Sequence, residues 1–196
     1  MNKMIKKVIN KLILLALFVL YLYGLLRIIL FKFHWMDMAL LWHHFERTLG
    51  NPDHLMSQLQ SGNYIPFQTI IINIHSLSVL RDFSNLFGNI ALFIPFGMFL
   101  VLFLKNKEIS FKGVFVLSFG LSLVLECLQV ISSLGIFDVD DLLLNTTGGL
   151  LGYCPIKLYD RIQTKLKINQ SNIVLERDIV ETQEIKNNEE GAPYSK

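Results

Sequence analysis

Long stretches of this sequence carry almost no charged side chain. Between Gly113 and Phe137 the only charged residue is Glu126, and between Asn85 and Leu104 there is none. A helix on the surface of a soluble protein needs a polar outer face, so uncharged runs of this length are typical of helices that cross a membrane. Composition agrees, because 52% of the 196 residues are hydrophobic and 17% are charged, where soluble domains have about 25% charged. We therefore expect an integral membrane protein.

Four segments are long and apolar enough to cross roughly 30 Å of hydrocarbon as helices. They cover residues 12–31, 86–104, 113–131 and 142–159, of which the last is the least apolar. A fifth segment, 65–80, contains several polar side chains and is interpreted as interfacial or re-entrant. The predicted fold class is all-α, a polytopic membrane helical bundle of about four transmembrane helices plus this interfacial or re-entrant segment.

The predicted organisation has five parts. They are a basic cytoplasmic N-terminus (1–11), a first transmembrane helix (12–31), an outward loop with the interfacial segment (32–84), a core of three transmembrane helices (85–160) and a flexible cytoplasmic tail (161–196). The basic start is also how a secretory signal peptide begins, but the apolar run is long and ends in bulky residues without a small-residue cleavage site. The first helix is therefore predicted to be an uncleaved signal anchor.

The distribution of lysine and arginine predicts how the chain is oriented. Basic residues precede the first span, fill the link between the second and third, and follow the fourth: Lys3, Lys6, Lys7, Lys11, Lys105, Lys107, Lys112, Lys157, Arg161, Lys165 and Lys167. The link between the third and fourth spans has no basic residue and three aspartates. By the positive-inside rule both termini are predicted to be cytoplasmic, and the aspartate link is predicted to face outward, in a multi-pass protein of the plasma membrane.

Polar residues inside the predicted helices are the candidates for function. Glu126 is the most costly, because a charged side chain near the bilayer centre costs about 2.5–3.5 kcal/mol. Helical spacing places Ser118, Ser122, Glu126 and Gln129 on one face of the third span.

The following helix repeats the pattern at spacings of three or four residues. Asp138, Asp141 and Asn145 share one face with a stripe of small residues. The small residues, predicted to allow close helix packing, are Gly148, Gly149 and Gly152.

These faces predict one acidic and amide-rich pocket near the outer end of the bundle. Its expected binding residues are Asn85, Asn89, Glu126, Gln129, Asp138, Asp141 and Asn145. An interhelical hydrogen-bond network that only locks the bundle remains an alternative for the amide and hydroxyl residues. For the acids a functional role is favoured, because an ionisable group inside the membrane is a functional-site hypothesis.

Other motifs give little support to further classes of function. The five histidines show no HExxH or regular His/Cys spacing, and the two cysteines form no CxxC. P-loop, GxGxxG and GxSxG motifs are not found either. No metal, cofactor or nucleic acid is predicted.

Four runs of the sequence resemble the VanZ-like family of bacterial membrane proteins. They are NYIPFQTI (63–70), NLFGNIALFIPFG (85–97), SLVLECLQ (122–129) and FDVDDLLLNTTGGLLGY (137–153). The family takes its name from a protein associated with low-level resistance to teicoplanin, a lipid-tailed glycopeptide antibiotic. The resemblance implies a role in the bacterial cell envelope and carries over the same seven polar residues that the helical faces select.

Three hypotheses for the function follow. In the first, the pocket binds a lipid-linked cell-wall component or a lipoglycopeptide and changes antibiotic susceptibility, with the lipid bilayer as the other partner. In the second, Glu126 with Asp138 or Asp141 acts as general acid and base in a hydrolase or transferase. In the third, Glu126 is the proton site of a proton-coupled transporter component. The second and third are alternatives, so enzymatic activity is left open, with binding favoured.

Overall fold

A computed structural model describes residues 3–30, 38–75, 80–104 and 109–190. Regular structure within these ranges is helical, in the order α1 (Lys3–Leu30), α2 (Met38–Gly50), α3 (Pro52–Gln60), α4 (Gln68–His75), α5 (Leu80–Phe103), α6 (Phe111–Ile131) and α7 (Val139–Glu190). Strand-like pairing in the described part is limited to one isolated parallel bridge, between Asn63 and Asp138. The chain is therefore all-α, as its sequence predicts.

Three helices of the described part are long and apolar enough to cross a membrane. They are Met4–Leu30, Asn85–Phe103 and Phe111–Ile131, and they match the first three predicted spans. The fourth predicted span, 142–159, lies inside α7 and is not a separate apolar helix of this kind. Its amide and hydroxyl side chains and its three glycines lower its hydropathy. The protein is thus a multi-pass helical membrane protein whose last core helix is the most polar.

The predicted interfacial or re-entrant segment contains a short helix. The eight residues of α4 rise only about 12 Å, too little to cross a bilayer. Residues 76–79 of the same segment lie outside the described residues, as do Lys105 and Lys107 of the predicted cytoplasmic link.

The chain divides into two compact units, Met1–Tyr153 and Cys154–Lys196. The second unit differs from the flexible tail that the sequence predicts for 161–196, because its residues are helical as far as Glu190. The physical reason is local: residues 156–190 contain no glycine or proline and are rich in Lys, Leu, Glu, Gln and Arg, which favour helix. The predicted part 191–196 lies outside the described residues.

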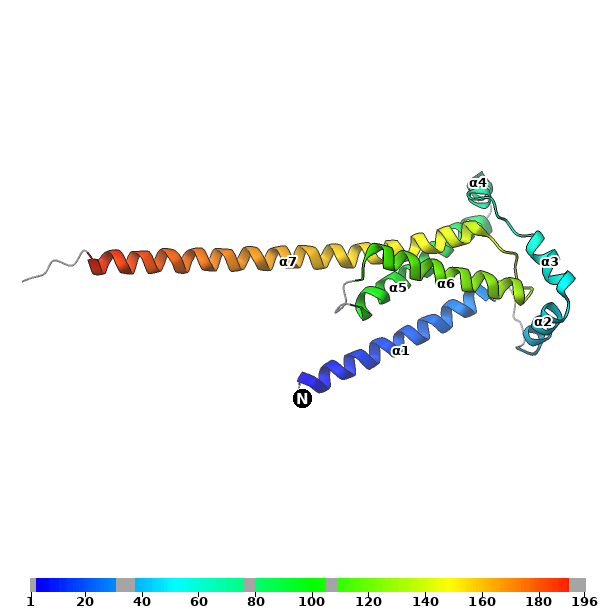
Figure 1. Cartoon of the computed structure of the whole chain (residues 1–196), viewed down its shortest axis with the longest axis horizontal. Coiled ribbons are helices and arrows are strands. Elements are labelled where there is room, and N and C mark those ends of the chain that lie inside the picture. Colours follow the sequence, from blue (N-terminus) through cyan, green and yellow to red (C-terminus); the bar gives the residue numbers. More distant parts are fainter. Residues whose placement is uncertain (1–2, 31–37, 76–79, 105–108, 191–196) are drawn as a thin grey trace, which may run out of the picture. The chain divides into compact units, whose positions relative to one another are not determined.

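The core of the first unit lies where α1, α5 and α6 meet. Leu25 and Ile29 of α1, Phe93 and Phe96 of α5 and Leu125 of α6 form a buried cluster. Figure 1 shows these three helices and the beginning of α7 running alongside one another, with α2 and α3 near the end of α6.

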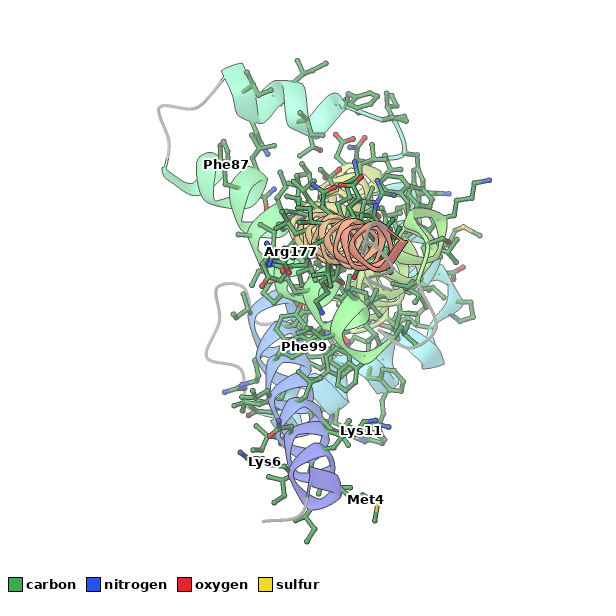
Figure 2. The ribbon with its side chains drawn as sticks, turned by 90° about the vertical axis from the view of Figure 1, so that its left-hand side faces the viewer. Met4, Lys6, Lys11, Phe87, Phe99 and Arg177 are labelled. Carbon is green, nitrogen blue, oxygen red and sulfur yellow. The ribbon has the colours of Figure 1, made fainter. Side chains whose placement is uncertain are left out.

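Aromatic rings fill the contact between α1 and α5. Phe18 lies 5.2 Å from the rings of both Phe99 and Phe103, centroid to centroid. Tyr21 donates a hydrogen bond of 2.7 Å to the carbonyl oxygen of Leu92. Figure 2 shows Lys6 and Lys11 towards the Met4 end of α1, and Phe99, which belongs to α5, further from that end. The exposed lysines of α1 thus lie beyond the apolar contact.

Glycines set the distance between α7 and its neighbours. A Cβ atom added to Gly148 or Gly152 would overlap the carbonyl oxygens of Ile90 and Ile94 on α5. One added to Gly149 would overlap the hydroxyl of Ser118 on α6. Backbone-to-backbone packing at this distance brings the first turns of α7, and the acids that they carry, against α5 and α6.

Candidate functional site

The loop before α4 and the loop before α7 are joined by their backbones. The amide of Asn63 donates to the carbonyl of Phe137 at 2.7 Å, and the amide of Val139 donates to the carbonyl of Asn63 at 3.0 Å. The ring of Tyr64 stacks on that of Phe137, 5.3 Å between centroids. These contacts fix the start of α7, where three aspartates stand within four residues.

Asp138 has the position and bonding of a helix N-cap. It directly precedes α7, and its Oδ1 accepts the amide N–H of Asp140 at 2.9 Å. The side-chain amide of Asn63 donates to the same oxygen at 2.9 Å, and the hydroxyl of Thr69 donates to Oδ2 at 2.8 Å. The carboxylate of Asp138 thus joins the start of α7 to the loop before α4 and to α4 itself.

Asp140 caps a different helix from the one on which it stands. Its carboxylate is fully buried and accepts the amide N–H groups of Phe67 at 2.5 Å and of Ile70 at 3.1 Å. Phe67 directly precedes α4 and Ile70 lies in its first turn, where a helix leaves N–H groups unpaired and favours negative charge. Phe67 has a φ of 70°, a conformation unusual for a bulky residue. The bond to Asp140 helps to hold the backbone there.

Five polar side chains line one small cavity beside this joint. They are Asn89 of α5, Glu126 and Gln129 of α6, and Asp141 and Asn145 of α7. Ile28 and Ile29 of α1 and Leu92 of α5 provide apolar walls. The cavity has a volume of about 20 Å³, which is room for about one water molecule.

Hydrogen bonds hold the polar side chains that line the cavity. The Asn89 side chain donates to the carboxylate of Asp141, and Gln129 donates to the carbonyl of Ile29 at 3.2 Å. Glu126 is only 2% exposed, and its Oε2 accepts the amide N–H of Asp138 at 3.1 Å. Glu126 therefore connects the cavity to the joined loops.

Five of the seven predicted binding residues thus share one cavity. Asp138 adjoins it through its backbone but directs its carboxylate to Asn63 and Thr69. Asn85 lies one turn before Asn89 on α5, is half-buried and is not among the described residues that line the cavity.

Three residues of this region are missed by reasoning on helical faces. Asp140, Asn63 and Thr69 form the joint between the loops, and all three lie outside the polar stripes. The run NYIPFQTI contains Asn63 and Thr69, so the family pattern holds the signal that could have found them. Asp140 is marked only by its place between two other aspartates.

A second polar cluster lies where α2 and α3 meet the end of α6. The hydroxyl of Ser133 is 2.9 Å from that of Thr48 and 3.1 Å from Nε2 of His54. Thr48 gives its proton to the carbonyl of His44, so Ser133 donates to Thr48 and His54 donates to Ser133. Because the His54 nitrogen is the donor, this cluster lacks the base that a serine nucleophile needs.

Metal ligands of the usual kinds do not gather in the described part of the chain, where no three His, Cys, Asp or Glu side chains are placed to share an ion.

Comparison with known proteins gives a family and a relative. The family model described as VanZ/LLP1 matches residues 18–160, a range that contains the later part of α1, all of α2 to α6 and the start of α7. The chain is 32% identical over 144 residues to Protein VanZ of Enterococcus faecium, covering 74% of this chain and 71% of that protein. No solved structure matches the chain.

Proposed function

The chain belongs to the VanZ/LLP1 family, and on that premise we propose that it lowers the susceptibility of a bacterial cell to glycopeptide antibiotics of the teicoplanin type. It would act in the plasma membrane, and its apolar helices are long enough to cross one. The proposal assigns the activity to the acidic and amide-rich end of the bundle.

One observation carries this assignment. Side chains from α5, α6 and α7 that are expensive to bury converge on one cavity, and Glu126 is among them at 2% exposed. Isolated polar residues would lock a helix pair equally well, so five of them in one place exceed what packing requires. Carboxylates and carboxamides together offer the donors and acceptors that sugar hydroxyls and peptide groups bind.

We propose that this end of the bundle faces away from the cytoplasm. Lys6 and Lys11 lie at the Met4 end of α1, whereas Ile29 near the other end of α1 bonds to Gln129 beside the cavity. The lysines of α1 and the acidic cavity therefore lie near opposite ends of this helix, with Arg27 as the basic residue of its last turn. The positive-inside rule assigns the lysine end to the cytoplasm.

A large ligand cannot enter the cavity in its present form, since about 20 Å³ admits one water-sized group. We propose that a lipid-linked cell-wall component or a lipoglycopeptide engages the site when the loop before α4 moves aside. Tyr64, Ile65 and Phe67 of that loop are more than half exposed and suit contact with acyl or aromatic groups.

The experiment is a susceptibility assay with matched variants. Wild type, Glu126→Gln, Asp141→Asn and Asn89→Ala are expressed in a susceptible strain, and the minimal inhibitory concentration of teicoplanin is measured. We expect wild type to raise it and the three variants to raise it less at equal membrane abundance. Asp53→Asn, which changes an exposed acid of α3, is the control and should match wild type. Equal protection by all variants would place the activity elsewhere.

A second candidate function is acid–base catalysis on a lipid-linked substrate. Glu126 and Asp141 line the same cavity, and a cavity that holds one water could present it to a substrate. Purified protein incubated with lipid-linked cell-wall precursors should then yield a changed product, and Glu126→Gln should abolish it. If the protein binds the precursor but leaves it chemically unchanged, the result would contradict catalysis and support binding as the function.

A further inference from the structure

The polar side chains that line the cavity carry more oxygen than nitrogen atoms. Each of its three carboxamides directs its NH2 group to a protein acceptor: Asn89 to Asp141, Gln129 to the carbonyl of Ile29, and Asn145 to the hydroxyl of Ser122 at 2.9 Å. The remaining polar atoms of these amides are oxygens. With the carboxylates of Glu126 and Asp141, oxygen acceptors make up most of the polar lining.

One of these oxygens has no partner. Asn145 is 3% exposed, and its Oδ1 accepts no hydrogen bond in the structure. Its Nδ2 points to Ser122, which does not line the cavity, so Oδ1 is the atom left to face it. A buried acceptor without a partner is costly, and a donor or a cation in the cavity would remove that cost.

We propose that the cavity binds one dehydrated sodium ion. Hard cations prefer oxygen ligands, and an oxygen lining with two carboxylates favours a positive charge over an anion or an apolar group. Magnesium keeps several of its waters, for which a cavity of about 20 Å³ has no room. Asn145 Oδ1 is the ligand on which the proposal depends most.

The protein holds the ligands in place before the ion arrives. The amide of Asp138 positions Glu126, and the Asn89 side chain positions Asp141. Because Asp138 also bonds to Asn63 and Thr69, an ion at Glu126 would stabilise the joined loops. The inference rests on the proposed function for the role of this end of the bundle, but sodium binding is measured without antibiotic, so the two can fail separately.

The test uses the full chain purified in detergent. Its thermal unfolding midpoint is followed against NaCl, with KCl, CaCl2 and choline chloride at equal ionic strength. We expect a rise of the midpoint that is specific to Na+. Asn145→Ala should remove this rise, whereas Asn145→Asp, which keeps an oxygen at that position, should retain it.

Ser118→Ala is the matched control, because it also removes a buried oxygen that has no partner but lies outside the cavity. It should leave the sodium response unchanged. Binding of radiolabelled Na+ to wild type, displaced by unlabelled Na+ and not by K+, Ca2+ or choline, tests the proposal even if Asn145→Ala fails to fold. Three results would each overturn the proposal: equal midpoints in all four salts, displacement of labelled Na+ by Ca2+, or a sodium response that survives Asn145→Ala. Equal midpoints would mean that the cavity holds a water molecule rather than an ion.

Discussion

Gly97 of α5 lies directly against Gly149 of α7, so that a Cβ atom added to Gly97 would overlap the carbonyl oxygen of Gly149. We expect Gly97→Ala to lower the free energy of unfolding in mixed micelles by about 1–3 kcal/mol, because the backbones must move apart. Gly120→Ala is the control. Gly120 of α6 has open space at the Cβ position, so alanine there should be neutral or stabilising by up to about 1 kcal/mol. Equal effects of the two variants would show that the helices are not in close contact at Gly97.

Tyr21 ties α1 to α5 through its hydroxyl group. Tyr21→Phe removes only the bond to the Leu92 carbonyl, and we expect the free energy of unfolding to fall by about 1 kcal/mol. Tyr23 is on the same helix and 61% exposed, so Tyr23→Phe should change nothing measurable. Denaturant titrations of both proteins provide the comparison, and a loss for Tyr23→Phe as large as for Tyr21→Phe would argue against the bond.

Asp140 caps α4 from a distance, and its removal should loosen the loop before that helix. We expect Asp140→Ala to cost about 1–2 kcal/mol of stability and to speed proteolysis within residues 61–70, because two amides lose their acceptor. Asp53 is an exposed acid in the first turn of α3, and Asp53→Ala should leave the cleavage rate unchanged. If Asp140→Ala is cleaved no faster than wild type, the loop is held by other contacts.

The pair formed by Asn89 and Asp141 can be tested by a double-mutant cycle. Asn89→Ala, Asp141→Ala and the double variant should show a coupling of about 1–2 kcal/mol in the free energy of unfolding, since the amide donates to the carboxylate. Asn89→Ala combined with Asp53→Ala should be additive within about 0.5 kcal/mol. Additive effects for the first pair would contradict the contact.

Helical spacing in the sequence finds the residues that face one another within the bundle. Spacing predicts Glu126 and Gln129 on one face of their helix and Asp141 and Asn145 on one face of the next. These four residues line the same cavity. The period of an α-helix determines such faces locally, so one chain is enough to predict them. The first three membrane spans are predicted equally well, from the length of the apolar runs in the sequence.

Contacts between loops are beyond this kind of reasoning. Asn63 and Asp138 are separated by 75 positions and meet through loop backbone, which has no period to reveal the partner. The same limit explains why helical faces predict Asp138 in the pocket although its carboxylate caps α7, and why they give no signal for Asp140. The size of the cavity also depends on how closely Gly148 and Gly149 let the helices approach, a distance that spacing alone does not give.

The dependence of α4 on Asp140 has a consequence for how the chain is made. A helix of eight residues is marginal by itself, and the carboxylate that caps it stands 70 positions after Ile70. A ribosome releases α4 long before it adds that carboxylate, so during biogenesis this segment must wait for α5 and α6 to be synthesised. The end of the bundle that bears the candidate site is therefore completed only after the three apolar helices have been made. A chain arrested before the aspartates would insert those helices without a formed site.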